Sequence, residues 1–185
     1  MTWILTSTGK RFDYADPQPQ QIDILDIAQA LAHECRYAGH ARRFYSVAQH
    51  SVLVSQIVPR EHALEALLHD AHEAYCKDIP RPLKALLPDY RAVEDRVDGV
   101  IRAHFGLPAK LSEAVATADL VLLATERRDL MPHDDVPWPI LDGIEPLARR
   151  MNTVHPERAQ AMFIRRWVEL GDRDDPRPVP ARHSA

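Results

Sequence analysis

The feature that most constrains this chain is residues 63–84, with the sequence ALEALLHDAHEAYCKDIPRPLK. Alanine and leucine surround its ionisable groups, and a helix that is apolar on most sides is normally buried. A buried carboxylate then needs a counter-charge or a metal ion. Residues three and four apart share one helix face, which places Glu73 one turn along from His69 and Asp70. We therefore interpret His69 and Asp70 as two metal ligands with the Glu73 carboxylate beside them.

A second His-Asp pair provides an internal comparison. His133 and Asp134 lie in MPHDDVPWP, a polar stretch interrupted by prolines, which is typical of a loop. A charge in solvent needs no partner, so we interpret this pair as ordinary loop residues. The His-Asp dipeptide is informative only in the apolar setting of residues 63–84.

Composition limits the class of protein. The 185 residues suit a single domain, expected over residues 1–170, with 45% apolar and 27% charged residues as in soluble globular proteins. A signal peptide and an apolar run of about 18 residues are lacking, so a cytoplasmic location is expected. The net charge of −4 argues against nucleic acid polymers and membranes as partners. Cys35 and Cys76 are interpreted as reduced core residues.

The spacing of apolar residues predicts an all-α fold, a compact bundle of about six helices with a small N-terminal β-hairpin that turns at Gly9. Arg36 and Tyr37 are expected in the last turn of the first helix, before Gly39. Residues 171–185 are polar and rich in proline, so a disordered tail is expected. The predicted helices cover residues 24–38, 46–58, 63–77, 90–105, 112–130 and 155–170.

Two further residues are singled out by their surroundings. Ser46 and Gln49 form a capping-box pattern that begins a helix, and His50 follows on its apolar face. Asp119 lies in ATADLVLLAT, where an unpaired carboxylate would cost several kcal/mol. Arg127 lies two turns further on, about 11 Å along the helix axis and too far for contact. Glu126, Arg127 and Arg128 are interpreted as a surface or interhelical ion-pair set.

A single metal ion would satisfy these separated groups. Two imidazoles and two carboxylates form a mixed nitrogen and oxygen set that suits Mn, Co, Fe, Ni or Zn, with Mg less favoured because histidines supply half of the ligands. The predicted metal ligands are His50, His69, Asp70 and Asp119.

Three segments together resemble the HD-domain metal-dependent phosphohydrolases: RFYSVAQHS, LLHDAHEAYCKDIPRPLK and ATADLVLLATERRDL. That family has a histidine, a His-Asp pair and a distant aspartate on a helical bundle. The likeness covers roughly residues 24–170 and is greatest to small bacterial and phage members related to the 5′-deoxynucleotidases. The resemblance implies the same four metal ligands and a small-molecule nucleotide substrate.

The resemblance also implies roles for residues around the metal. It makes Glu73 a catalytic glutamate and Asp78 an active-site carboxylate, and it places Tyr37 near the base or sugar. Physical reasoning agrees in part: a divalent ion lowers the pKa of bound water towards ~7, and Glu73 or Asp78 could then transfer protons. Arg36 as a bidentate fork and Lys84 as a point charge suit the phosphate.

These features predict a 5′-deoxynucleotidase that hydrolyses deoxynucleoside monophosphates with metal-activated water. A monophosphate is favoured because the chain is short and has few surplus basic residues near the motifs. The alternatives are a deoxynucleoside triphosphate triphosphohydrolase, a hydrolase of cyclic nucleotides or alarmones, and a nucleotide-binding sensor without turnover. Glu73 argues against the sensor, since binding alone needs no such carboxylate. Formation of a homo-oligomer is left open.

Overall fold

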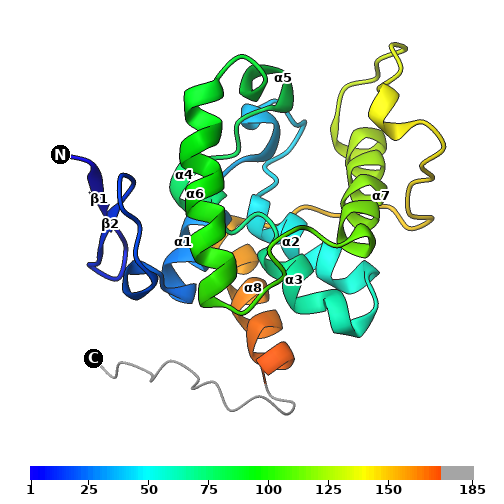
Figure 1. Ribbon diagram of the computed structural model, residues 1–185. Coiled ribbons are helices and arrows are strands. Elements are labelled where there is room, and N and C mark those ends of the chain that lie inside the picture. Colours follow the sequence, from blue (N-terminus) through cyan, green and yellow to red (C-terminus); the bar gives the residue numbers. More distant parts are fainter. Residues whose placement is uncertain (172–185) are drawn as a thin grey trace.

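In the computed structural model, which describes residues 1–171, helices form most of the chain and one small hairpin lies at the N-terminal end (Figure 1). Strand β1 (Trp3–Leu5) pairs antiparallel with β2 (Arg11–Asp13), so the predicted all-α fold with a hairpin is confirmed. The disordered tail was predicted for residues 171–185, and residues 172–185 lie outside the part of the chain that the structure describes. The helices are α1 (Ile24–His33), α2 (Val47–Ile57), α3 (Ala63–Leu68), α4 (Glu73–Cys76), α5 (Arg81–Lys84), α6 (Pro88–His104), α7 (Glu113–Leu130) and α8 (Pro156–Gly171).

Serine caps begin two of the helices. The predicted capping box at Ser46 forms only in part, because the Gln49 side chain bonds to the backbone of Asn152 and Val154 instead of to Ser46. The Ser46 hydroxyl accepts a hydrogen bond from the Gln49 amide at 3.2 Å and begins α2. Ser112 caps α7 in the same way through the Val115 amide, at 3.4 Å. Such a cap contributes about 1 kcal/mol. None of the helices within residues 1–171 is long and apolar enough to cross a membrane.

The end of α1 differs from the prediction. Helix α1 ends at His33, and residues 36–39 form a separate short 3₁₀ turn, so placing Arg36 and Tyr37 in its last turn was wrong. Cys35 instead forms an isolated β-bridge with Ser46, which pulls the chain out of the helix. Tyr37 and Ala38 then adopt left-handed backbone conformations, with φ of 57° and 50°. These conformations cost about 1–2 kcal/mol per residue and persist only where surrounding contacts fix them.

The central helix is also interrupted. Helix α3 ends at Leu68 and α4 begins at Glu73, so His69 and Asp70 occupy a turn between two helices rather than one continuous helix. The His69 ring explains the break, because its Nδ1 lies 2.8 Å from the Ala66 carbonyl oxygen. A continuing helix would use that oxygen for the Asp70 amide, and a side chain that competes for it disturbs the helical ladder.

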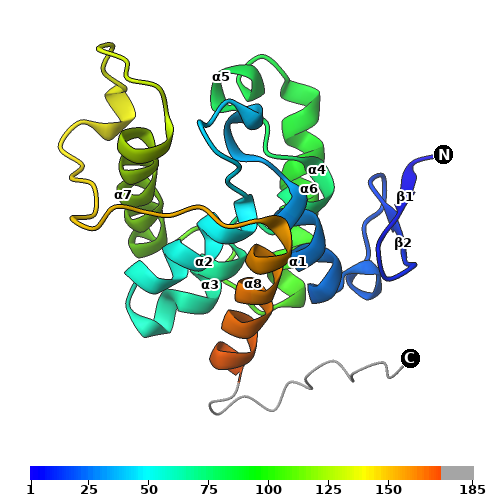
Figure 2. The same ribbon diagram turned by 180° about the vertical axis from the view of Figure 1, so that it is seen from behind.

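Two apolar clusters hold the helices together. The larger packs α1, α2, α3, α4, α6 and α8, and it includes Phe12 of the hairpin stacked on Tyr75. The smaller joins α7 to α2 and α3 through Val54, Ala66, Val115, Ala118 and Leu122. Figures 1 and 2 show α7 beside α2 and α3 and on the opposite side of the molecule from α6. Helix α7 is therefore attached along a limited apolar surface.

The hairpin is fixed to α1 by the buried carboxylate of Asp26. Its oxygens accept hydrogen bonds from the Ser7 hydroxyl at 2.6 Å and from the amide and hydroxyl of Thr8, both at 2.7 Å. Burial raises the pKa of Asp26, but these hydrogen bonds outweigh burial and leave the pKa below its ordinary value of 3.8. The stabilisation is thus present when the carboxylate is ionised, and it is lost as the pH falls through the lowered pKa.

We predict that Asp26→Asn lowers the free energy of unfolding by about 2 kcal/mol at neutral pH, since it weakens hydrogen bonds to a charged acceptor. The difference from the wild type should shrink below pH 4, where Asp26 of the unfolded wild type binds a proton. Urea unfolding at both pH values measures this difference. Asp16→Asn, on the exposed surface of the same region, is the control and should change little; an Asp26→Asn effect independent of pH would contradict the assignment.

Candidate metal centre

Three separate segments bring their ionisable side chains to one point. His50 comes from α2, His69 from the turn after α3, and Asp119 from α7, and each offers a ligand atom within 4.8 Å of the others. His50 Nε2 lies 3.1 Å from Asp119 Oδ1. Asp70 also reaches this point, because its Oδ2 lies 3.2 Å from His69 Nε2 and 3.7 Å from His50 Nε2. All four predicted ligands therefore lie together.

The two histidines have the orientation that a metal ion requires. Each Nδ1 faces an acceptor: that of His69 faces the Ala66 carbonyl oxygen at 2.8 Å, and that of His50 faces Glu126 Oε1 at 2.7 Å. Each neutral ring therefore carries its proton on Nδ1 and directs the Nε2 lone pair into the site. Both Nε2 atoms are buried, and neither makes a hydrogen bond within residues 1–171. Such orphaned nitrogens beside carboxylates fit a divalent transition metal.

The electrostatics of the site favour positive charge. Burial and Arg36 oppose protonation of His50, yet Glu126 and Asp119 outweigh them and raise its pKa to about 9. Burial likewise opposes protonation of His69, but Asp70 raises its pKa. The pKa of Asp119 is lowered: burial raises it, and the close His50 imidazole, together with the charge of His69, outweighs burial. A metal cation would replace these protons, since ligand imidazoles must be deprotonated.

Glu73 and Asp78 supply protonatable groups beside the ligands. Glu73 is only 6% exposed, and its Oε2 has no hydrogen-bond partner in the described part of the chain. Burial, followed by the charges of Asp70 and Asp78, raises the pKa of Glu73 well above its ordinary value. Burial also raises the pKa of Asp78, although Arg36 opposes it. The Glu73 carboxyl therefore holds its proton to a higher pH than an ordinary glutamate does, which suits a proton donor.

Arg36 and Tyr37 lie against the metal ligands, although the role of both in substrate binding stays a prediction. Arg36 Nη1 is 3.7 Å from Asp70 Oδ2, and its Nε donates to Glu126 Oε2 at 3.2 Å. The Tyr37 hydroxyl donates to the same Glu126 oxygen. Because this hydroxyl points inward, the ring is the part of Tyr37 that a base or sugar could contact.

Lys84, the other predicted phosphate-binding residue, forms an ion pair with a glutamate. Its Nζ lies 2.6 Å from Oε1 of Glu94, a residue of α6, and the lysine side chain is 22% exposed. A phosphate would therefore have to compete with Glu94 for this ammonium group. The predicted role of Lys84 stays untested.

Glu126 is the site residue that the sequence prediction missed. The prediction of a surface or interhelical ion-pair set holds for Glu126 in its interhelical form, because Glu126 pairs with His50 of α2 and with Arg36. The sequence did not show that this carboxylate is fully buried or that its partners belong to the candidate metal centre. The arginines that follow do lie at the surface: Arg127 donates to the carbonyl oxygen of Val136, at 2.6 Å. Spacing contained the signal, because residue 126 follows Asp119 by seven positions, about two turns, and so shares its helix face.

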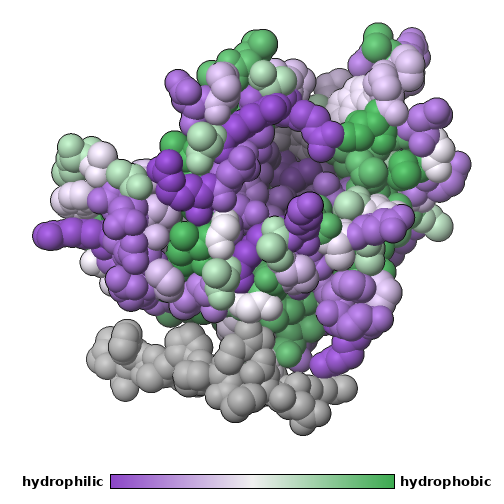
Figure 3. All heavy atoms as spheres, viewed as in Figure 1, coloured by the Kyte–Doolittle hydropathy of each residue, from purple (hydrophilic) through white to green (hydrophobic). Residues whose placement is uncertain are grey.

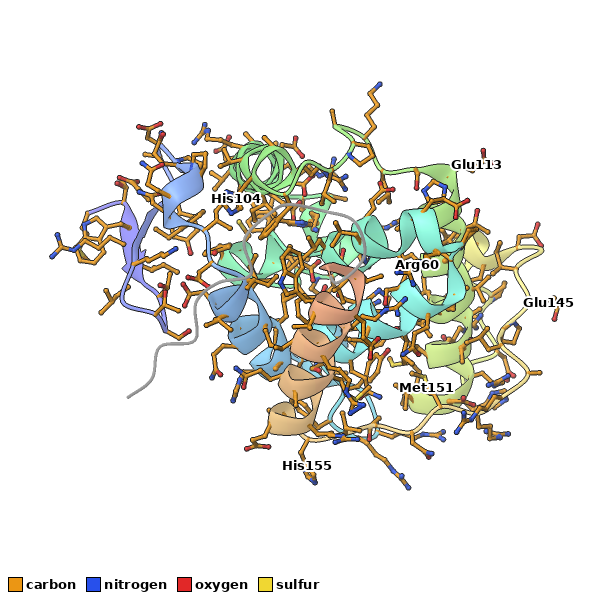
Figure 4. The ribbon with its side chains drawn as sticks, turned by 90° about the horizontal axis from the view of Figure 1, so that it is seen from below. Arg60, His104, Glu113, Glu145, Met151 and His155 are labelled. Carbon is orange, nitrogen blue, oxygen red and sulfur yellow. The ribbon has the colours of Figure 1, made fainter. Side chains whose placement is uncertain are left out.

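One face of the molecule is hollowed. Figure 3 shows a depression with hydrophilic side chains between the part over α5 and α6 and the part over α7. A second, shallow groove of about 410 Å³ lies at the junction of α2 and α7, near the labelled Arg60 and Glu113 in Figure 4. Its lining is mostly apolar and lacks the metal-ligand residues: Ile57, Val58, Pro59, Glu113, Ala114, Thr117, Ala118 and Val121.

Comparisons with known proteins identify relatives over nearly the whole chain. The sequence matches no family model. It is 51% identical over 174 residues to a protein of Escherichia coli (strain K12) named Uncharacterized protein YfdR, a match that covers 93% of this chain and 97% of the relative. It is 36% identical over 142 residues to an uncharacterized protein of Rhodobacter capsulatus, covering 69% of this chain and 72% of that relative. The chain therefore belongs to the protein family that includes YfdR.

Proposed function

We propose that this protein is an HD-type, metal-dependent phosphohydrolase and that its substrate is a 5′-deoxynucleotide, in the first place a deoxynucleoside monophosphate. The observation that carries the proposal is the convergence of His50, His69 and Asp119, whose ligand atoms lie within 4.8 Å of one another. The resemblance of the three sequence segments to HD-domain phosphohydrolases supplies the reaction class and the substrate class.

The chemistry divides between the metal and the protein. His50, His69, Asp70 and Asp119 would hold a divalent transition metal, which supplies Lewis acidity towards water and a phosphoryl oxygen. In the proposed reaction a water molecule attacks phosphorus and gives up one proton, which the phosphate product or a site carboxylate takes. The bond between phosphorus and the 5′ oxygen breaks, and that oxygen takes up a proton and leaves as the alcohol. Glu73, whose pKa is raised by burial, is the proposed proton donor, with Asp78 as the competing group.

Arg36 is the proposed anchor for the phosphate. Its guanidinium lies between Glu126 and Asp70, which fixes its position beside the ligands. Rigid donors that face developing negative charge are an effective form of transition-state stabilisation.

The purified protein should release inorganic phosphate from deoxynucleoside monophosphates in the presence of Mn²⁺ or Co²⁺, and a chelator should stop the reaction. A panel of deoxynucleoside mono- and triphosphates, cyclic nucleotides and 3′-pyrophosphate nucleotides, analysed for products, measures this. Release of intact tripolyphosphate would replace the monophosphatase proposal with a triphosphohydrolase. Absence of turnover across the whole panel would contradict the proposed function.

A further inference from the structure

One buried carboxylate joins the metal side of the site to the phosphate side. Glu126 Oε1 accepts hydrogen bonds from His50 Nδ1 at 2.7 Å and from the Tyr45 hydroxyl at 2.8 Å. Its Oε2 accepts from Arg36 Nε at 3.2 Å and from the Tyr37 hydroxyl. Each oxygen therefore has two donors, and these four donors lie outside α7, where Glu126 itself resides.

We propose that Glu126 is the positioning residue of the metal centre. It fixes the tautomer and orientation of His50, and its hydrogen bonds to Arg36 and Tyr37 fix the position of the Arg36 guanidinium, the proposed phosphate anchor. The inference rests on the metal centre of the proposed function but is independent of the identity of the substrate.

The effect on His50 follows from the hydrogen-bond inventory. Four donors occupy the two oxygens of Glu126, so the shared proton belongs to His50 Nδ1, and Nε2 keeps its lone pair for the metal. A carboxylate behind a ligand imidazole also raises its basicity, and loss of such an outer partner typically weakens metal binding by about 10–100-fold. His69 has only a neutral carbonyl behind it, so His50 is the ligand that depends on a charged partner.

The effect on Arg36 follows from the backbone. Tyr37 and Ala38 have left-handed conformations that are unfavourable for non-glycine residues, and Arg36 directly precedes them. The side-chain hydrogen bonds of Arg36 and Tyr37 to Glu126 hold this turn against α7, beside a backbone hydrogen bond from the Arg36 amide to the Tyr45 carbonyl oxygen. Without Glu126, the turn would lose its buried acceptor, and the guanidinium would lose its fixed position.

Two substitutions at Glu126 test the proposal through metal binding itself. Metal-free wild type, Glu126→Ala and Glu126→Gln are titrated with Co²⁺, and the visible absorption of the bound ion is recorded. We expect the dissociation constant for Co²⁺ to rise about 10–100-fold in both variants. Glutamine matches glutamate in size, but its NH₂ group is a donor and must replace one of the two acceptor oxygens. If it faces Arg36 and Tyr37, donor meets donor. If it faces His50, the imidazole must accept at Nδ1 and carry its proton on Nε2, which removes the lone pair for the metal.

A spectroscopic readout separates positioning from general destabilisation. In the Zn²⁺-loaded wild type, NMR should show a slowly exchanging proton on His50 Nδ1, and Glu126→Gln should shift or lose this signal. Asp26→Asn is the matched control, because it removes another buried, hydrogen-bonded carboxylate far from the metal ligands in the fold. It should lower stability but leave Co²⁺ affinity unchanged.

The outcomes distinguish the two proposals. If the wild type binds no Co²⁺, the proposed metal centre fails and this inference fails with it. If the wild type binds Co²⁺ and the folded Glu126 variants bind it with the same affinity and spectrum, only the positioning role is refuted. Equal weakening in Asp26→Asn would also refute it, because the effect would then reflect stability. If Glu126→Ala does not fold, Glu126→Gln decides the result.

Discussion

The His69→Ala variant is expected to retain no stoichiometric Mn²⁺ or Co²⁺ and to lose metal-dependent turnover. The substitution removes one of the two Nε2 lone pairs that converge with Asp119. The site then keeps only one of its two imidazole nitrogens, and imidazole nitrogens are the ligands that favour a transition metal. Affinity should fall by more than the ~10–100-fold that loss of an outer-sphere partner costs. Elemental analysis and phosphate release on the same samples measure the two effects.

His133→Ala is the matched control for this prediction. It removes the histidine of the other His-Asp pair, whose side chain is 86% exposed. Metal content and turnover should remain at wild-type levels. If His69→Ala kept the metal, or if both variants lost it equally, the assignment of His69 as a ligand would be wrong.

The Glu73→Gln variant is expected to keep the metal and to lose turnover by about 10²–10⁴-fold, the usual contribution of a general acid or base. Glutamine preserves the size of the buried side chain but cannot donate the carboxyl proton. Metal content, kcat and KM should be measured together, and the loss should fall on kcat.

Asp78→Asn is the comparison that identifies the proton donor. A larger loss of kcat in Asp78→Asn than in Glu73→Gln would transfer the role to Asp78. Loss of the metal from Glu73→Gln would mean that Glu73 is itself a ligand. Unchanged turnover in both variants would leave the site without a proton donor among its described carboxyls and would overturn the proposed mechanism.

The parts of the fold that the sequence predicted are those that local chemistry determines. Ser46 and Ser112 cap their helices with their own hydroxyls, so each boundary depends on residues within three positions. The candidate ligands were identified from acids with aliphatic neighbours in the sequence, and they do lie together, although the Asp119 side chain is 29% exposed rather than fully buried.

The parts that the sequence did not predict depend on tertiary contacts. The helix break at His69 requires the ring to reach the Ala66 carbonyl, which apolar periodicity does not register. The left-handed turn at Tyr37 is held by a partner 89 positions away in sequence. The sequence did not identify the partners of Glu126, because its donors come from segments far away in the chain.

The distribution of the ligands along the chain has a consequence for biosynthesis. His50, His69 and Asp119 come from segments that meet only after α7 has docked on α2 and α3. A nascent polypeptide that ends before residue 119 cannot complete the coordination sphere. Binding of the proposed ion would therefore follow assembly of the tertiary structure. The bound ion would make release of α7 less favourable as the free ion concentration rises.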